Sequence, residues 1–436
     1  MLPIVPWSPG TTCDRLDAIQ SRLGGPSPRT LEEASRIIDR VRREGDQALV
    51  ELTRELDGVE LTTETIRVSR AQLETLASTI DPKLLASLEQ GADNIRSLHS
   101  KNLEPTPAQT HADGSIVKTR VLPIGSAGIY VPGGSASYPS ALLMSAIPAV
   151  VAGVDRIVAV TPPQALARTP ALAAAMLIAG VDEVYQVGGA QAVAALAYGT
   201  ESIKRVHKIV GPGNRWIAAA KQLVYGVVGI DAMAGPSEVV VLADDQARPS
   251  WVAADLVAQA EHGPDTASIA IVGDLSLAQA IQAEVEVQVG RLPRAKTAQV
   301  ALTRYGTIFV CGSTESACRL INILAPEHLQ LLTAEADSLL PQINHAGAIF
   351  LGHYSPQAVG NYLAGPSCVL PTAGASRFSS PLGVHDFLKR SHVVRWTASR
   401  LAQRGEDIVR LARAEGCEGH AESVKIRLEG TPGDET

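Results

Sequence analysis

The chain has 436 residues, too many for a single hydrophobic core, which predicts about two to four domains. Its composition, 45% apolar and 19% charged, is that of a folded soluble protein and excludes long disordered regions. A net charge of −7 and an aromatic content of 4% exclude a typical nucleic-acid-binding surface, because basic patches and stacking platforms are both scarce.

Residues 1 to about 105 are predicted to be mostly helical, with capping boxes at Thr30–Glu33 and Ser69–Gln72 opening amphipathic runs. From Val117 onward short strand-like runs alternate with helices. The predicted strands are 116–122, 127–131, 156–161, 183–187, 206–210 and 238–243, and the predicted helices are 139–153, 170–180, 190–198 and 214–225. The strands lack clean polar alternation, which favours a parallel sheet covered on both faces.

A second α/β round follows the first. Strands are predicted at 268–272, 307–311 and 346–351, with helices at 275–289 and 314–324. We therefore predict an α/β fold with two Rossmann-like, doubly wound parallel-sheet domains, although a GxGxxG fingerprint is absent. Beyond about residue 381 the chain is predicted to be polar and helical, with a last strand at 423–428.

No export or membrane segment is predicted. Pro3 and Pro6 interrupt the amino terminus where a signal peptide needs an unbroken apolar run, and the most apolar stretch, 141–154, is too short to span a membrane. We expect that stretch to be a buried helix. None of the five cysteines forms a CxxC pair, which is typical of reduced thiols in the cytoplasm: Cys13, Cys311, Cys318, Cys368 and Cys417.

The stretch Asp255–Asp265 is predicted to contain the end of a helix, since Pro249 suits a first turn and Gly263-Pro264 is a stop signal. Gln259 and His262 are three residues apart and therefore share one helical face. A carboxamide oxygen and a neutral imidazole at the negative end of a helix dipole could hold a divalent cation. The alternative is that His262 only caps the helix.

Four glycine-rich turns follow predicted strands, where open α/β sheets bind ligands: Gly128–Gly134, Gly188–Gln191, Gly211–Asn214 and Ala234–Ser237. They are either ordinary turns or an atypical dinucleotide site. Glu327 and His328 follow a predicted helix and could divide proton transfer, with the imidazole accepting a proton from an alcohol and the carboxylate activating water. The alternative for this pair is a polar helix end. Glu415–His420 offers a further carboxylate and imidazole.

Seven motifs in chain order resemble those of the histidinol dehydrogenase family: Gly128–Gly134, Val187–Ala192, Gly211–Asn214, Ala234–Glu238, Gln259–Asp265, Ala325–Leu329 and Glu415–His420. The resemblance covers nearly the whole chain and is weakest in the first hundred residues and the tail. It implies a cytoplasmic homodimer that contains zinc and uses two NAD to oxidise the small molecule L-histidinol, through histidinal, to L-histidine.

The resemblance also implies residue roles. Gln259, His262, Asn361 and His420 stand at the zinc-ligand positions, with His420 supplied by the partner subunit. Tyr130, Gln191 and Asn214 match NAD-contacting positions. Glu327 and His328 match the catalytic water activator and proton acceptor. The substrate-contacting positions are Ser237, Gln259, His262, His328, Asn361, Cys368, Glu415 and His420, with Glu415 also crossing the dimer interface.

The domain division that we expect has four parts. Residues 1–25 pack with the C-terminal part, and residues 26–129 join 239–380 in a discontinuous first domain that holds the metal and catalytic residues. Residues 130–238 form the second domain, on the NAD side. Residues 381–436 are dimerisation segments.

Two positions depart from the family pattern. Asn361 stands where the family has a ligand aspartate, and Cys368 stands where it has a substrate-contacting histidine. The metal would be held by neutral groups alone, so we expect zinc affinity to be weaker by about one or more orders of magnitude. A Cys368 thiolate ligand is an alternative.

Three hypotheses follow from these departures: an active histidinol dehydrogenase, a relative that oxidises a different small polar alcohol, and a non-catalytic relative. The intact Glu327-His328 pair and the intact cofactor loops argue against the third.

Overall fold

The computed structural model describes residues 2–103, 108–133, 137–232 and 235–430. The chain divides into two compact units. The larger unit comprises residues 1–102 and 124–387, and the smaller one comprises residues 103–123 and 388–436. Within the described ranges, no helix has both the length and the apolar character needed to cross a membrane.

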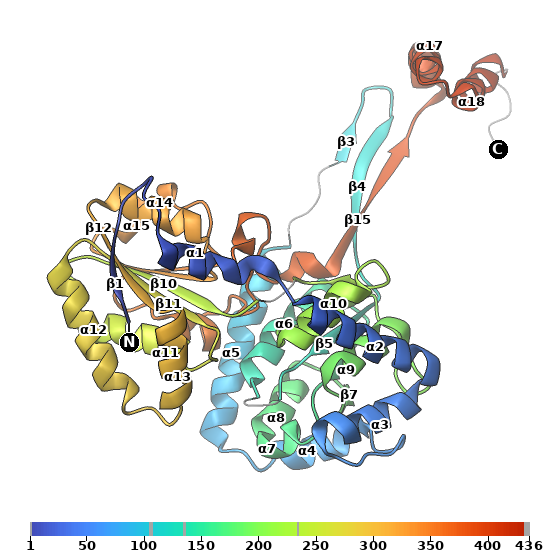
Figure 1. The fold of residues 1–436 in the computed structure, drawn as a ribbon. Helices are drawn as coiled ribbons and strands as arrows, with labels where there is room; N and C mark the ends of the chain where they lie inside the picture. The colour runs from blue at the N-terminus through green and yellow to red at the C-terminus, as the bar shows by residue number, and fades with distance from the viewer. Residues whose placement is uncertain (1, 104–107, 134–136, 233–234, 431–436) are drawn as a thin grey trace. The chain divides into compact units, whose positions relative to one another are not determined.

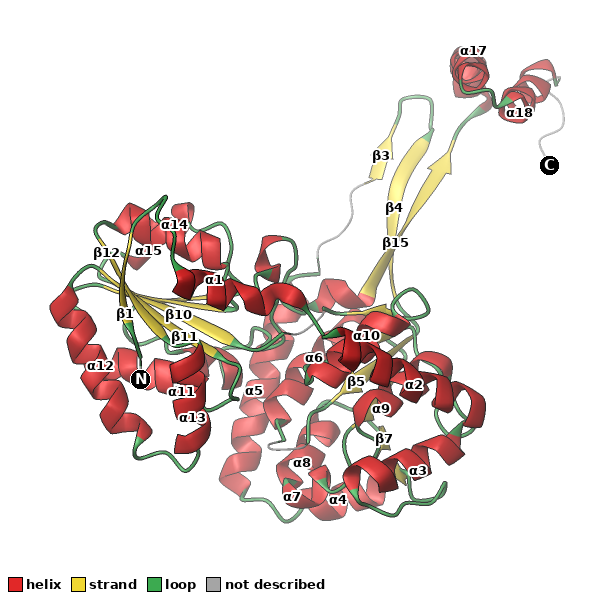
Figure 2. Cartoon of the chain, in the orientation of Figure 1, coloured by secondary structure: helices red, strands yellow, loops and turns green. Residues whose placement is uncertain are grey.

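The first sheet of the larger unit has six strands, all parallel (Figures 1 and 2). Their order is β1 (Ile4–Trp7), β12 (Thr307–Cys311), β11 (Ala267–Val272), β10 (Glu238–Ala243), β13 (His328–Leu332) and β14 (Ala348–Leu351). Strands β10, β11 and β13 are buried at every position, which accounts for their nearly continuous apolar sequences. From β10 the chain first adds β11 and β12 on one side and then returns to add β13 and β14 on the other. The topological switch point therefore lies between β10 and β13.

Helices cover both faces of this first sheet. One apolar cluster joins it to α11 (Pro249–Ala260), α12 (Leu275–Val289) and α13 (Ala295–Arg304). A second cluster joins it to α1 (Asp14–Gln20), α14 (Thr314–Leu324) and α15 (Ala336–Leu339). The result is a layered helix–sheet–helix domain.

The second sheet has the order β2 (Arg67–Val68), β7 (Glu183–Tyr185), β6 (Arg156–Val160), β5 (Ser126–Tyr130), β8 (Lys208–Val210) and β9 (Gly229–Ile230). Every pair is parallel except β2 with β7. The switch point lies between β5 and β8, which again is the arrangement of a doubly wound sheet.

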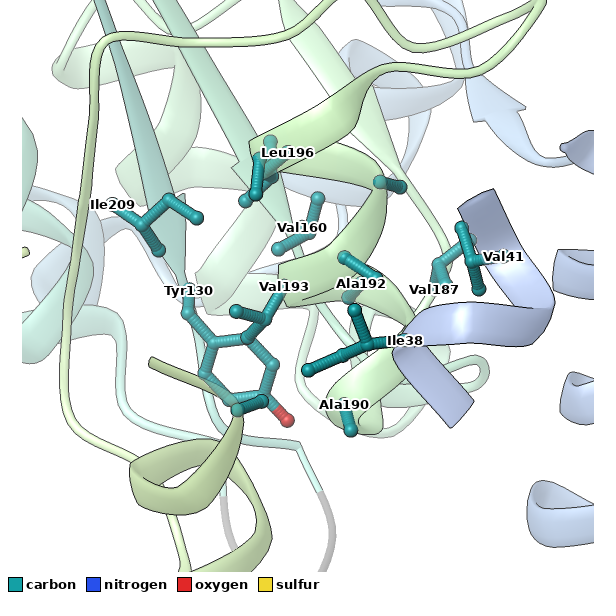
Figure 3. Packing of buried hydrophobic residues seen from close by; sticks show 14 of the residues in the cluster. Ile38, Val41, Tyr130, Val160, Val187, Ala190, Ala192, Val193, Leu196 and Ile209 are labelled. Atoms are coloured by element: carbon teal, nitrogen blue, oxygen red, sulfur yellow. The ribbon is translucent and has the colours of Figure 1, made fainter. Parts of the chain in front are cut away.

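One apolar cluster attaches four helices to this second sheet: α2 (Pro28–Glu44), α3 (Asp46–Asp57), α9 (Gly189–Tyr198) and α10 (Arg215–Val224). Figure 3 shows Ile38 of α2 beside Ala190 and Val193 of α9. The other helices of this domain pack with one another, with α6 also against β5 and β6: α4 (Arg70–Ala77), α5 (Pro82–Lys101), α6 (Pro139–Ala152), α7 (Ala165–Arg168) and α8 (Pro170–Ile178).

The smaller unit combines an antiparallel sheet with a helical hairpin. The sheet order is β15 (Leu388–Arg395), β4 (Ile116–Pro123) and β3 (Ala108–Thr110), and the helices are α17 (Ala398–Ala414) and α18 (Glu418–Glu429). Its apolar core is small and centres on Val409, Ala412 and Ala421.

The predicted α/β fold with two doubly wound, mainly parallel sheets is confirmed, whereas several local predictions are wrong. Residues 423–428 belong to helix α18, and 388–395 form strand β15 in a region predicted to be helical. Strand 116–122 exists, but it belongs to the antiparallel sheet of the smaller unit. Strands β1 and β13 were not predicted.

The two sheets also divide the sequence differently from the predicted domains. Residues 26–129 were expected to join 239–380, yet α2, α3, β2 and β5 belong to the second sheet and its cluster. The apolar stripe of α2, which includes Ile38 and Val41, is buried against α9 and α10. Residues 1–25 supply β1 and α1 to the first sheet.

Candidate active site

Glu327 and His328 lie where β13 begins, beside the first residues of β10. Both residues are about 5% exposed, and His328 is paired in register with Val239. Helix α14 ends just before them, as predicted, but a polar helix end is excluded by their burial. This is the amino edge of the sheet, opposite to the edge at which open α/β sheets usually bind ligands.

The backbone N–H and carbonyl of Glu238 hold the two side chains. Its N–H donates to Glu327 Oε2 at 2.9 Å, and its carbonyl accepts from His328 Nδ1 at 3.2 Å. Because a carbonyl only accepts, Nδ1 must carry the proton, and Nε2 of the neutral ring then keeps a lone pair. Nε2 is buried and has no partner in the described part of the chain. The ring is therefore set up as a proton acceptor.

Neighbouring groups tune His328. Burial lowers its pKa, but Glu327, the Glu238 carbonyl and the Asn361 side chain outweigh that effect, so that the pKa is raised overall. Glu327 Oε2 lies 3.5 Å from Nδ1, and the ring of Phe350 stacks at a centroid distance of 6.2 Å. A raised pKa makes the imidazole a stronger proton acceptor.

Helix α11 ends at Ala260, close to the predicted stop, so Gln259 lies in its last turn. His262 lies in the turn that follows rather than on the helical face that was predicted. Gln259 is 1% exposed, and neither atom of its amide has a partner among the described residues. His262 is solvent-exposed, yet the surrounding protein lowers its pKa through desolvation, and the charges of Glu327 and His328 also act on it. Gln259, His262, Glu327 and His328 thus share one site.

Asn361 and Cys368 reach this site from the segment after β14. Asn361 lies on α16 (Gln357–Tyr362), and its side chain raises the pKa of His328. The Cys368 N–H donates to Met144 Sδ of α6 at 3.2 Å. Burial, aided by the charge of Glu327, raises the pKa of the Cys368 thiol to about 12. In the absence of a metal ion, this thiol therefore keeps its proton.

These residues fit a divalent cation held by neutral donors. The carboxamides of Gln259 and Asn361 and the imidazole of His262 offer oxygen and nitrogen ligands. An unpartnered buried amide costs about 1–3 kcal/mol, and a cation bound to Gln259 would offset that cost. Within the described ranges, no cluster of three or more His, Cys, Asp or Glu side chains could hold a metal.

The predicted NAD-contacting residues lie together at the carboxyl edge of the second sheet. Tyr130 ends β5, and its buried hydroxyl accepts from the Gly189 N–H at 3.4 Å; burial raises its pKa to about 12. Gln191 lies in the first turn of α9, fully buried, and neither atom of its amide is partnered in the described chain. Asn214 is exposed and caps α10 by accepting from the backbone N–H groups of the next turn.

The Gly211 turn is held by a buried ion pair. Lys221 Nζ lies 2.7 Å from Asp231 Oδ1 and also donates to the Gly211 carbonyl, while Asp231 Oδ2 accepts from the Gly211 N–H. Gly211 has φ +115°, and a Cβ there would lie 2.2 Å from the Tyr130 carbonyl oxygen. Only glycine fits this position. The Gln191 amide at the same edge has no partner in the described chain. This edge therefore suits a polar ligand that contacts the loops.

Other predicted site residues lie elsewhere. Ser237 directly precedes β10 and is half-buried. Glu415, which caps α17, and His420, in the first turn of α18, are exposed and belong to the smaller unit, so the larger unit alone does not contain the full predicted set. Gly134 and Ala234 lie outside the described residues.

One polar pair behind the site was not predicted. Gln330 Nε2 donates to Asp255 Oδ2 at 2.7 Å, and burial raises the pKa of Asp255 to about 6. Asp255 is four residues before Gln259 on one helical face, and Gln330 is two residues after His328 on one sheet face. This spacing was the sequence feature from which the pair could have been predicted. Arg22, which contacts Glu238, gave none.

Comparison with known proteins agrees with this arrangement. The histidinol dehydrogenase family model matches residues 25–428. A histidinol dehydrogenase from Halalkalibacterium halodurans is 47% identical over 396 residues, covering 90% of this chain and 92% of that protein. One from Geobacillus kaustophilus is 48% identical over 395 residues, with coverages of 90% and 92%. The crystal structure of histidinol dehydrogenase from Elizabethkingia anophelis gives a TM-score of 0.90 at 33% identity and covers 98% of both chains. The chain therefore belongs to the histidinol dehydrogenase family.

Proposed function

We propose that this chain oxidises L-histidinol to histidinal and then to L-histidine in histidine biosynthesis. Family membership over residues 25–428 supports this activity. The observation that carries it is the backbone of Glu238, which orients His328 so that its buried Nε2, unpartnered within the described residues, can accept a proton beside Glu327. The overall reaction consumes one water and removes two hydrides, and NAD bound over the Tyr130, Gln191 and Asn214 loops would accept them.

In the first oxidation, His328 Nε2 accepts the hydroxyl proton as the carbinol carbon loses hydride. This step forms the aldehyde, histidinal, and breaks no carbon–carbon bond. In the second oxidation, Glu327 takes a proton from water, whose oxygen bonds to the aldehyde carbon while the carbonyl oxygen takes the proton held by His328, which gives the hydrate. The hydrate then loses the second hydride and a proton to become the carboxylic acid. Glu327 Oε2 and His328 Nδ1 are only 3.5 Å apart, which supports the proposal that both groups act on the same bound substrate.

The residues that would bind a metal ion are Gln259, His262 and Asn361, with His420 of the partner subunit. A bound zinc ion would supply a fixed positive charge that orients the substrate and favours its neutral amine and imidazole. The neutral donor set lacks an anion, so we expect this zinc to be held weakly. Ser237, Cys368 and Glu415 complete the proposed substrate contacts.

We further propose a cytoplasmic homodimer in which the smaller unit supplies Glu415 and His420 to the partner. The smaller unit has few core residues, yet it exposes the large apolar side chains of Val394, Leu411 and Ile426. A groove of about 420 Å³ lies along Trp396 and Leu401 of the same unit. Apolar surface of this kind favours a protein partner.

A second candidate function is the oxidation of another small polar alcohol. Asn361 and the neutral thiol of Cys368 favour it, because together they leave the pocket without the anion and the imidazole expected from the family. Such a pocket would bind histidinol less strongly than the family pattern does.

An activity assay separates these proposals. Purified protein, supplemented with zinc and NAD, is given L-histidinol, and NADH is followed by absorbance together with histidine formation. Two NADH per histidine support the proposed function. If only other amino alcohols or small diols are oxidised, the second candidate is correct, and if no alcohol reduces NAD, both are wrong. Glu327→Gln is the internal control: it should slow histidine formation from histidinal more than aldehyde formation from histidinol.

A further inference from the structure

One arginine from the start of the chain holds the three residues that enter β10. Arg22 lies in the 3-10 helix η1 (Ser21–Gly24), and its side chain is 4% exposed. Its Nη2 donates to the carbonyls of Pro236 at 2.9 Å and Ser237 at 3.1 Å, and Nη1 donates to Glu238 Oε2 at 3.2 Å. The guanidinium also lies 5.2 Å from the ring centroid of Tyr305. A planar cation with several donors fixes this segment in one orientation.

The same cation compensates a buried acid. Glu238 is 6% exposed, and burial raises the pKa of its carboxyl to about 7, an effect that Arg22 opposes and the charge of Glu327 increases. Arg22 forms its only ion pair within the described chain. Without Arg22, the Glu238 carboxylate would lie buried beside the carboxylate of Glu327, so the segment would have to move or take up a proton.

Glu238 is also the residue whose backbone contacts both proposed catalytic groups, through two successive peptide groups. Its N–H fixes Glu327 Oε2, and its carbonyl fixes the proton on His328 Nδ1. A rotation of the Ser237–Glu238 peptide would therefore release the Glu327 carboxylate. A shift of the next peptide, which carries the Glu238 carbonyl, would let the imidazole take the other tautomer. The guanidinium binds the Ser237 carbonyl, which belongs to the same peptide group as the Glu238 N–H, and also the Pro236 carbonyl one residue earlier.

We propose that Arg22 is a positioning residue for the oxidation: through the backbone of Ser237 and Glu238, it sets the orientation of Glu327 and the tautomer of His328. The inference rests on the proposed function for its kinetic consequence, but the tautomer of His328 can be observed without turnover. Arg22 itself touches neither the reacting carbon nor the transferred proton.

The chain contains a matched control for this arrangement. Arg156, at the start of β6, pairs with Glu183 through two bonds of 2.7 Å and donates to the carbonyls of Lys204 at 3.0 Å and Arg205 at 3.1 Å. It therefore combines one carboxylate with two consecutive carbonyls, as Arg22 does. Arg156 lies in the second sheet, and its hydrogen bonds within the described residues reach none of the proposed site residues.

The test compares two charge-free double variants, R22M/E238Q and R156M/E183Q. Removing both charges avoids an uncompensated buried acid, so we expect both proteins to unfold close to wild type. For R22M/E238Q we expect kcat to fall by at least about tenfold while KM for NAD stays within about twofold. The nitrogen NMR shifts of the His328 ring, assigned by difference from His328→Gln, should change from one tautomer to a mixture. R156M/E183Q should leave kcat and the His328 shifts unchanged.

Two single variants complete the test. Glu238→Gln keeps Arg22 on both carbonyls and should retain most of the activity. Arg22→Lys keeps the charge but loses the fork of donors, and it should lose kcat even if the double variant does not fold. A stable R22M/E238Q protein with wild-type kcat and a single His328 tautomer overturns the proposal, as does a fully active Arg22→Lys. If wild type does not oxidise histidinol, the proposed function fails, and the His328 tautomer still decides the role of Arg22.

Discussion

Replacing Asp255 by asparagine tests whether the polar layer behind the site carries an uncompensated charge. Asp255 is half-buried, accepts from Gln330 at 2.7 Å, and forms no ion pair with any residue that the structure describes. Burial raises its pKa from 3.8 to about 6. An asparagine at this position keeps an oxygen for Gln330 Nε2 and removes the charge, so the variant isolates the electrostatic effect.

The sign and size of the effect follow from proton linkage. Because the folded-state pKa lies above the unfolded one, the folded protein binds more protons between about pH 4 and pH 6, and stability is lost as pH rises through that window. At about 1.36 kcal/mol per pKa unit, the loss is at most about 3 kcal/mol. Partial solvent access to Asp255 reduces it below that bound.

The assay is urea denaturation of metal-free protein at several pH values between about 4 and 7. Relative to wild type, Asp255→Asn should become more stable as pH rises and then level off above about pH 6. Asp265→Asn is the control, since Asp265 lies near His262 in sequence but is exposed and paired with Arg304 at 2.7 Å. Parallel pH curves for wild type and Asp255→Asn would refute the reasoning.

Three further predictions concern the proposed ligand sites. Gln259→Leu should stabilise the metal-free protein by about 1 kcal/mol, because its buried amide has no partner, and abolish stoichiometric metal in elemental analysis; a less stable metal-free variant contradicts this. Asn361→Asp should raise zinc affinity at least about tenfold in chelator competition, whereas unchanged affinity means that the missing anion is unimportant. Lys221→Met should lower the free energy of unfolding in urea by about 3–5 kcal/mol, because Asp231 is left buried without a cation. It should also weaken NAD binding measured by titration. Unaltered NAD affinity would show that the Gly211 turn does not contribute to cofactor binding.

Much of the fold was predictable because it is encoded locally. Strand 238–243 and strand 307–311 have the predicted bounds, since their residues are apolar and bounded by turn-forming residues. Residues 423–428 alternate polar and apolar side chains and so were predicted as a strand. In the structure Ala421, Val424 and Leu428 form a helical stripe on α17, and this contact decides the conformation.

The candidate site was predictable only where its residues are neighbours in sequence. Gln259 with His262 and Glu327 with His328 were found because each pair lies within one short motif. The contact between Arg22 and Glu238 joins positions 216 residues apart, and no local pattern encodes it. Its prediction requires the strand order, which places the amino ends of β10 and β13 together beside the N-terminal segment.

The sheet that carries Glu327 and His328 is assembled from two segments of the chain that flank a long insertion. Strand β1 pairs with β12, so Ile4 meets Ile308, while the second sheet and its helices are built from the sequence between β1 and β10. During synthesis, that intervening domain can fold while β1 still lacks its partner. An apolar strand without a neighbour is a template for association with other chains. We therefore expect translation pauses or chaperone binding before residue 311 to govern how much active protein a cell recovers.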